Sequence, residues 1–160
     1  MKHVINPRNQ EHWAGGVGSF ILNFGAIEAE TVFWIRHLRT SMEPVKRAVQ
    51  ANFARRVAIV REHLDAFDGD PELKAQSVAA WEEALDLATF FRNKIAHSPL
   101  VLSPDLIGFL EFRSARGEKL QFVDTIDKAQ LNEAIDDAAR IAQRLLELRE
   151  RLAPDKPEQQ

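Results

Sequence analysis

The chain of 160 residues contains no cysteine and no tyrosine. Without cysteine it has no disulfide framework and no thiolate that could act as a nucleophile or a metal ligand. Such a composition is compatible with a reducing compartment, and we expect a cytoplasmic protein. The length fits one domain that buries roughly two thirds of its unfolded surface.

A long apolar run is also lacking. The most apolar stretch, residues 17–29, is interrupted by Asn23 and Glu28 and is too short to span a bilayer. The N-terminal residues do not have the pattern of a signal peptide. We therefore expect no membrane partner.

A surplus of positive charge is missing as well, because the formal net charge is -3. This balance argues against bulk electrostatic attraction to nucleic acid. The charge is uneven, however: residues 36–61 are mostly basic, and residues 62–86 are mostly acidic. Three interpretations stay open, namely two helices paired across a seam, a local RNA footprint and, as the favoured one, an ordinary solvated surface.

Several familiar sites are absent from the pattern. The histidines outside residues 90–99 have no metal-ligand spacing: His3, His12, His37 and His63. The glycines at 15, 16 and 18 are not preceded by a strand or followed by a lysine, as a phosphate-binding loop requires. No serine lies in a nucleophile elbow. We expect neither a metal nor a cofactor.

Apolar residues recur at steps of three and four over most of the chain, which predicts helices at about 11–38, 42–67, 72–97 and 128–152. Apolar runs at 106–112 and 120–123 flank a polar turn in which Gly117 takes positive φ, so a β-hairpin is expected within 104–124. Asp127 and Gln130 have capping-box spacing before the last helix. The predicted fold is all-α, a single domain over 1–160. It is an antiparallel bundle of four long helices with the hairpin inserted before the last, and with 1–10 and 154–160 flexible.

The end of the third predicted helix carries the most informative segment, residues 90–99. Arg92 supplies a permanent cation, Asn93 an amide, and His97 an imidazole, the side chain that changes charge near neutral pH. These groups are the ones needed to stabilise a reacting phosphate and to move protons around it. Pro99 ends the helix, because the residue before a proline is disfavoured in the helical region.

This segment resembles the signature of the HEPN superfamily, small all-helical domains found in many prokaryotic toxins and RNA-processing enzymes. The signature is an arginine, a polar residue that is often asparagine, a short spacer and a histidine, and Arg92, Asn93 and His97 match it in order and spacing. The resemblance implies a metal-independent endoribonuclease of toxin or stress-response type. It implies a homodimer with the cleft between paired domains, RNA as substrate, a possible protein antitoxin, and products with 2′,3′-cyclic phosphate and 5′-hydroxyl ends.

Helix geometry limits what one copy of the motif can do. Asn93 and His97 are four residues apart and share a face, whereas Arg92 is turned by about 100° from Asn93. An ideal helix therefore cannot direct all three groups at one atom. Two remedies are considered: loosening of the helix at its end with Arg92 curling back, or pairing of two copies across a two-fold axis.

The expected roles are those of a nuclease. His97 acts as base or acid with the partner's His97 in the complementary role, Arg92 holds the phosphate oxygens, and Asn93 orients His97 or the phosphate. The alternative is a non-catalytic HEPN-like interaction module, or one that binds RNA or nucleotides. A histidine near a helix C-terminus is favoured by the helix dipole whatever its function.

Three further residues carry expectations. Glu28 shares a helix face with apolar residues, so we expect it to be partly buried in a structural ion pair, with Arg92 as the natural partner and Glu30 as the runner-up for the same position. Trp13 is the tryptophan expected to be exposed. Related toxins silenced by a nucleotidyltransferase often carry a tyrosine two residues after the histidine. Pro99 occupies that position, so control by this modification is not expected.

Overall fold

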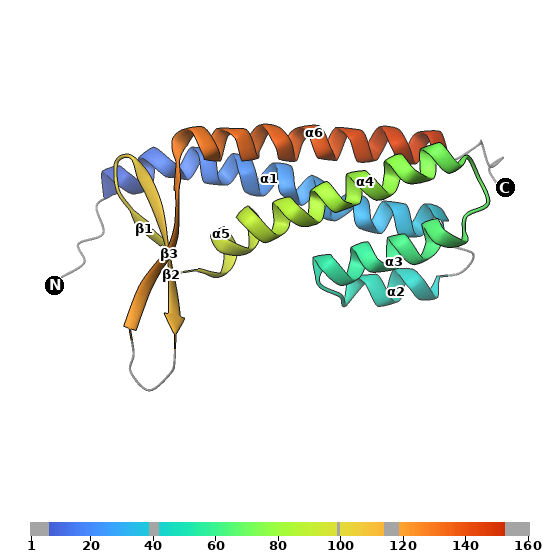
Figure 1. Cartoon of the computed structure of the whole chain (residues 1–160), viewed down its shortest axis with the longest axis horizontal. Helices are drawn as coiled ribbons and strands as arrows, with labels where there is room; N and C mark the ends of the chain where they lie inside the picture. Colours follow the sequence, from blue (N-terminus) through green and yellow to red (C-terminus); the bar gives the residue numbers. More distant parts are fainter. Residues whose placement is uncertain (1–6, 39–41, 99, 114–118, 153–160) are drawn as a thin grey trace. The chain divides into compact units, whose positions relative to one another are not determined.

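We describe the protein from a computed structural model that covers residues 7–38, 42–98, 100–113 and 119–152 (Figure 1). The elements in chain order are α1 (Pro7–Leu38), α2 (Glu43–Val49), α3 (Phe53–Ala66), α4 (Pro71–Leu87), the π-helical turn η1 (Ala88–Arg92), α5 (Asn93–His97), β1 (Leu100–Leu102), β2 (Leu106–Arg113), β3 (Lys119–Asp127) and α6 (Lys128–Leu152). The predicted helical fold with a small antiparallel sheet is confirmed.

The chain forms two compact units, which are described one at a time. The first unit comprises the described residues of 1–22 and 87–137, and the second comprises those of 23–86 and 138–160. The first half of α1 thus belongs to one unit and the second half to the other, and α6 is divided in the same way. Among the described residues, no helix is both long enough and apolar enough to cross a membrane.

The first helix begins earlier than expected. Residues 7–10, assigned from the sequence to a flexible arm, are the first turn of α1, which starts at Pro7. Proline suits the first helical position because its fixed φ is already helical and its missing N–H would have no helical partner there. The remaining residues of the two predicted flexible ends, 1–6 and 154–160, lie outside the described residues.

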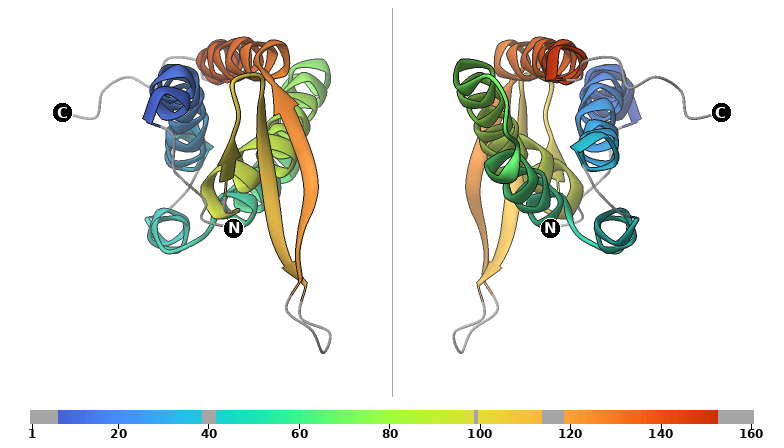
Figure 2. Two further views of the ribbon diagram at one scale, coloured as in Figure 1. Left: turned by 90° about the vertical axis from the view of Figure 1, so that its left-hand side faces the viewer. Right: turned by 90° about the vertical axis from the view of Figure 1, so that its right-hand side faces the viewer.

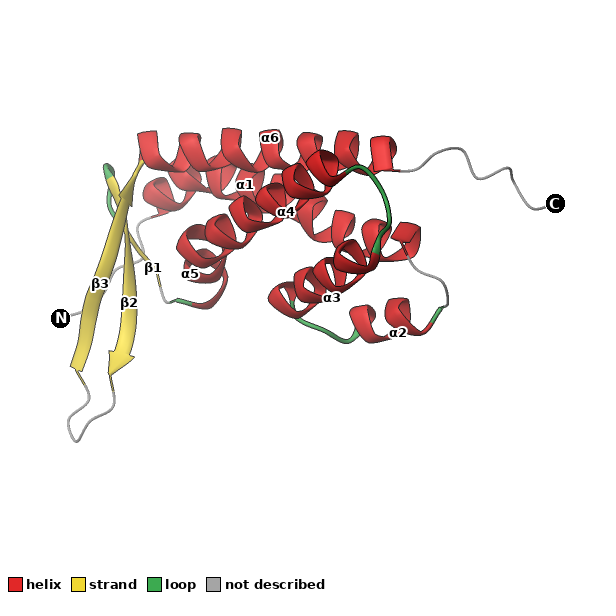
Figure 3. Cartoon of the chain, turned by 45° about the vertical axis from the view of Figure 1, so that its right-hand side comes forward, coloured by secondary structure: helices red, strands yellow, loops and turns green. Residues whose placement is uncertain are grey.

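The second predicted helix, residues 42–67, is divided into α2 and α3 (Figure 3). Asn52 has extended backbone angles of φ -68° and ψ 168°, and its side chain accepts a hydrogen bond of 2.9 Å from the backbone N–H of Arg55. An asparagine in this position starts a new helix, because it satisfies one of the otherwise unpaired N–H groups. The apolar period continues across the break, and so the sequence pattern concealed it.

Three tight contacts define the core of the second unit. The Trp34 indole donates a hydrogen bond of 3.1 Å to the carbonyl of Leu145, which joins α1 to α6. The Trp34 ring also meets the Trp81 ring of α4 edge-on, with 5.8 Å between centroids. Phe24 of α1 and Phe53 of α3 meet in the same way at 5.2 Å. Helix α1 therefore contacts α3, α4 and α6 in this unit.

The order of helix directions in this unit differs from the expected alternation. The α4 helix runs antiparallel to α6, with Glu83 beside Arg140 and Gln76 beside Arg151. In contrast, the parts of α1 and α6 in this unit run parallel, as the progress of the colours along the two helices shows (Figure 1). The break at Asn52 explains the difference, because the α2–α3 pair adds one reversal to the chain.

The first unit contains the sheet, whose strand order is β1-β2-β3 with antiparallel pairing throughout (Figure 2). The β2–β3 hairpin was predicted, whereas β1 was not, because three residues after Pro99 give too short a pattern. Ile107, Phe109 and Ile126 are buried. The predicted positive φ of Gly117 lies outside the described residues.

Trp13 ties the sheet to α1 in the first unit. Its indole donates a hydrogen bond of 2.7 Å to the carbonyl of Ser103, and the Asn9 side chain donates one of 3.0 Å to the carbonyl of Leu102. Trp13 is buried, so the expectation that it is exposed was wrong. Because the indole N–H has a hydrogen-bond acceptor, burying it costs little free energy.

The capping box at the start of α6 is confirmed. The Asp127 carboxylate accepts a hydrogen bond of 2.8 Å from the backbone N–H of Gln130, and the Gln130 side chain accepts one of 2.9 Å from the backbone N–H of Asp127. These two bonds fix where β3 ends and the helix begins.

Candidate functional site

A π-helical turn in the first unit ends at Arg92, the first of the three motif residues. In this turn, η1, the backbone N–H of Asn93 donates to the carbonyl of Ala88, five residues earlier, in place of the usual four. Such a turn inserts one residue into the helix and changes the direction of the side chains that follow. The sequence showed only a continuous helical stripe through Ala88, Phe91 and Ile95, so the turn was not foreseen.

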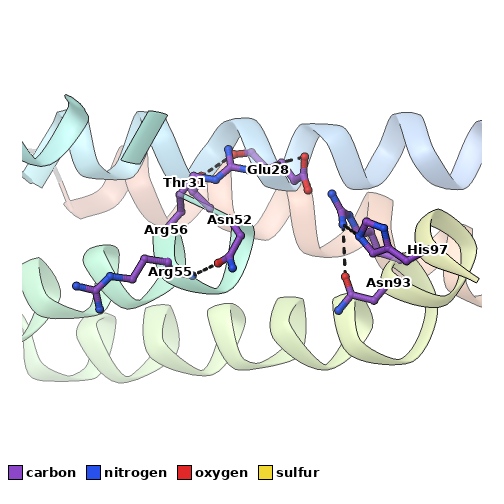
Figure 4. Close-up of polar contacts among 8 residues, drawn as sticks. Glu28, Thr31, Asn52, Arg55, Arg56, Asn93 and His97 are labelled. Carbon is purple, nitrogen blue, oxygen red and sulfur yellow. Dashed lines mark hydrogen bonds and ion pairs between the residues drawn. The ribbon is translucent and has the colours of Figure 1, made fainter. Parts of the chain in front are cut away.

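The three motif side chains lie together within one chain. Arg92 Nη1 lies 3.1 Å from His97 Nε2 and donates a hydrogen bond of 3.4 Å to Asn93 Oδ1. Figure 4 shows Asn93 and His97 side by side at the end of the helix. The guanidinium thus bridges the amide and the imidazole. Residues 93–97 form the regular helix α5, so Arg92 makes these contacts by curling its long side chain back, as considered from the sequence. The pairing of two copies stays a prediction.

The contact between Arg92 and His97 specifies the tautomer of the imidazole. A guanidinium has five N–H donors and no acceptor, so Nε2 must be the acceptor and carry no proton. The neutral ring then holds its proton on Nδ1. Arg92 therefore keeps His97 in the form whose Nε2 lone pair can receive a proton, but occupies that lone pair itself.

The cluster is accessible. Asn93 and His97 are exposed, and Arg92 is half-buried. His97 is the last residue of α5, and the helix ends at Ser98, which has extended backbone angles of φ -98° and ψ 140°. The predicted helix end before Pro99 is thus confirmed.

The hairpin contributes a group that was not identified from the sequence. Lys94 forms an ion pair with Asp124 of β3, and its ammonium lies 5.9 Å from the centroid of the Phe90 ring. The hydrogen bond from Lys94 lowers the pKa of Asp124 below its ordinary value, against the opposing effect of partial burial. The ion pair fastens the strand to the helix that carries Asn93 and His97.

The register of the hairpin is irregular next to Asp124. Phe109 pairs with Asp124, whereas Leu110 pairs with Phe122, so β3 has one extra residue, Val123. A bulge of this kind bends the strand and redirects a neighbouring side chain. A π turn in the helix and a bulge in the strand thus lie on the two sides of the Lys94–Asp124 pair.

Glu28 and Glu30 are both ion-paired in the second unit. An Arg56 nitrogen lies 3.9 Å from the Glu28 carboxylate, and the backbone carbonyl of Glu28 accepts a hydrogen bond of 2.6 Å from Thr31 (Figure 4). Glu30, the more buried of the two, accepts hydrogen bonds of 2.9 and 3.3 Å from Arg149. Arg92 belongs to the other unit, and its pairing with Glu28 stays a prediction.

One ion pair in the second unit links the basic stretch of the sequence to the acidic stretch. Arg61 of α3 lies 3.5 Å from Glu82 of α4, and both side chains are about half exposed. Pairs of this exposure contribute little to stability. Within the described ranges, no group of three or more acidic, histidine or cysteine side chains is arranged to hold a metal ion.

No protein-family model matches the chain, and neither a curated protein nor a solved structure matches it.

Proposed function

We propose that the protein is a metal-independent endoribonuclease of the HEPN type that works as a homodimer. The observation that carries the proposal is the Arg92-centred cluster, in which one guanidinium lies 3.1 Å from His97 Nε2 and 3.4 Å from Asn93 Oδ1. A cation beside a neutral imidazole, both reachable from solvent, is the pair of groups that RNA cleavage by an internal hydroxyl requires. The motif resemblance supplies the family.

The proposed reaction begins with an exchange of hydrogen bonds. A non-bridging phosphate oxygen of RNA replaces His97 as the acceptor of the Arg92 N–H, because a charged acceptor forms the stronger bond. Nε2 of His97 is then free to take the proton of the 2′-hydroxyl. The 2′-oxygen attacks phosphorus, the bond to the 5′-oxygen breaks, and the products are a 2′,3′-cyclic phosphate and a 5′-hydroxyl.

The departing 5′-oxygen needs a proton donor, and the first unit of one chain offers a single histidine in the cluster. In the proposed homodimer the protonated His97 of the partner subunit supplies it. An exposed apolar side chain next to the motif supports pairing: Phe90, two residues before Arg92, is 60% exposed. Large exposed apolar side chains favour a protein contact.

The wider proposal follows the resemblance. The chain is one cytoplasmic domain of 160 residues, whose long helices form a single bundle that holds the motif. Its activity is that of a toxin or stress-response effector, with RNA as substrate and a protein antitoxin as the possible partner.

The decisive test is RNA cleavage in EDTA by the wild type, Arg92→Ala and His97→Ala. We expect cyclic phosphate ends from the wild type and a loss of at least about 10²-fold in each variant, the typical cost of removing an oxyanion donor or a general base. Arg55→Ala, an exposed arginine of α3, and His63→Ala serve as matched controls. All variants are checked by circular dichroism and by sedimentation, which also reports the dimer.

The results separate the hypotheses. Equal cleavage by all five proteins would reject the site. No cleavage of total RNA or of a panel of structured RNAs by the wild type would favour the alternative, a non-catalytic helical module that binds a protein, RNA or nucleotides. That alternative also has an observation in its favour, since the side chains of the Arg92 cluster bond to one another and the exposed Phe90 lies two residues away.

A further inference from the structure

A second basic site lies in the second unit, where the C-terminal end of α1 meets α6. Phe33, Arg36, His37 and Arg149 line a pocket of about 240 Å³. The Phe33 ring is 46% exposed, and the Arg149 guanidinium carbon lies 5.4 Å from its centroid. The pocket therefore combines an accessible aromatic ring with basic side chains from two helices.

Arg149 is held rigidly in this pocket. Its Nε and Nη2 atoms donate hydrogen bonds of 2.9 and 3.3 Å to the two oxygens of Glu30, which is buried. A fork of this kind fixes the plane of the guanidinium against the Phe33 ring, and Nη1 is not part of it. Glu30 neutralises the charge of Arg149, so the positive charge that the pocket offers to a ligand comes from Arg36.

The helix dipole alone accounts for some of these residues, because cations are favoured in the last turn of any helix. It accounts for Arg149 too, which lies in the last turn of α6. It does not account for a large aromatic side chain left half exposed next to basic groups from two helices. An aromatic face beside guanidinium groups is the arrangement with which proteins bind single-stranded RNA, the base stacking on the ring and the phosphate meeting the cation.

The geometry points to this pocket as a binding subsite for one nucleotide of single-stranded RNA, with the base on Phe33 and its phosphate at Arg36 and His37. The volume is below the roughly 300 to 1,000 Å³ of pockets for whole drug-sized ligands, which suits a phosphate and part of a nucleotide. The inference rests on the proposed function, because it identifies a second place on the protein, apart from the reacting groups, where the RNA substrate is bound. It also explains how a chain of net charge -3 binds RNA, by a local site.

The test uses a short fluorescent oligoribonucleotide in which every 2′-hydroxyl is methylated. This probe lacks the attacking group and cannot be cleaved by the proposed reaction, so binding is measured apart from catalysis. Anisotropy titrations over a range of salt compare the full-length wild type with Phe33→Ala, Arg36→Ala and, as the matched control, Arg55→Ala. Arg149 is left unchanged because its loss would leave the buried Glu30 without its partner.

Each variant has a distinct expected result. Phe33→Ala weakens binding about five-fold or more with an unchanged salt dependence, because stacking does not release counterions. Arg36→Ala weakens binding and reduces the slope of log K against log salt by about 0.7, the value for one phosphate contact on a single strand. Arg55→Ala is expected to match the wild type in both respects.

The outcomes separate this inference from the proposed function. Unchanged affinity in both Phe33→Ala and Arg36→Ala would overturn the subsite, even if unmethylated RNA is still cleaved through His97. If Phe33→Ala and Arg36→Ala weaken binding but the wild type cleaves no RNA, the subsite stands and the nuclease proposal is rejected. Displacement of the probe by adenosine monophosphate at equal concentration would show that a free nucleotide, and not RNA, is the ligand, and would overturn the assignment to RNA.

Discussion

Arg92 Nη1 lies 3.1 Å from His97 Nε2. Arg92 directly precedes the short helix α5, and His97 is the last residue of that helix. Because the arginine side chain can only donate hydrogen bonds, the Nδ1-protonated tautomer must predominate whenever the His97 ring is uncharged. A ¹⁵N–¹H correlation spectrum of the imidazole at mildly alkaline pH is expected to show Nε2 without a proton. In Arg92→Ala this constraint is lost, and the spectrum should move toward a mixture of tautomers. A proton on Nε2 in the wild type would contradict the contact.

Arg92→Lys tests whether the shape of the guanidinium matters as well as its charge. A lysine keeps the positive charge but replaces the planar guanidinium, which can hold two phosphate oxygens side by side, with a compact ammonium. We expect the variant to fold like the wild type and to lose roughly tenfold or more of its cleavage rate. Single-turnover kinetics with saturating RNA make the comparison independent of binding. Retention of the full rate would mean that charge alone suffices.

Local signals in the sequence were sufficient to place several boundaries. The capping box at Asp127 and the stop before Pro99 were both predicted, since each depends on two or three neighbouring residues. The Asn52 break and strand β1 were missed, although an asparagine cap and a short apolar run are visible there. Each was outweighed by a stronger pattern, the continuing apolar period in one case and the proline stop in the other.

The arrangement of the candidate site was less predictable. Arg92, Asn93 and His97 were identified from their order and chemistry, but the contacts of Arg92 with both neighbours depend on the conformation of its side chain, which no residue pattern indicated. The π turn that ends at Arg92 was not foreseen either, because the apolar stripe runs through it. Asp124 was missed for a similar reason, because only the sheet register and its bulge bring it to Lys94.

Asp124→Asn should loosen the end of α5 with little effect on global stability. The Asp124 side chain is 44% exposed, and ion pairs of this kind contribute about 0–1 kcal/mol. The local effect is larger, since Lys94 also provides the carbonyl that accepts the backbone N–H of Ser98 at 3.0 Å. We expect faster hydrogen exchange at the Ser98 amide. The free energy of unfolding, measured by urea titration, should change by no more than about 1 kcal/mol. Asp105→Asn, which removes an exposed carboxylate elsewhere in the unit, is the control.

The acid stability of the protein should depend on Glu83. Partial burial raises the pKa of this carboxyl, but hydrogen bonds from Arg140 and Arg144 outweigh the burial and leave the pKa below the ordinary value of 4.5. The unfolded chain then binds more protons than the folded chain, so the contribution is present above pH 4.5 and is lost as the pH falls through the lowered pKa. In urea titrations at a series of pH values over this range, the free energy of unfolding of Glu83→Gln should fall less steeply with decreasing pH than that of the wild type. Identical pH profiles would show that the two arginines do not hold the carboxylate.

Two adjacent glycines of α1 should respond oppositely to alanine, and the reason is packing. In the part of the chain that the structure describes, a Cβ at Gly15 would meet no atom within 4 Å, whereas one at Gly16 would lie 2.9 Å from Leu131 Cδ2 of α6. Alanine is favoured over glycine within a helix, so Gly15→Ala should raise the free energy of unfolding by about 0.5–1 kcal/mol. Gly16→Ala gains the same propensity but must displace Leu131, which is buried, and we expect no net gain or a loss. Urea denaturation of both variants makes the comparison, and an equal gain at the two positions would mean that α1 and α6 do not approach closely at Gly16.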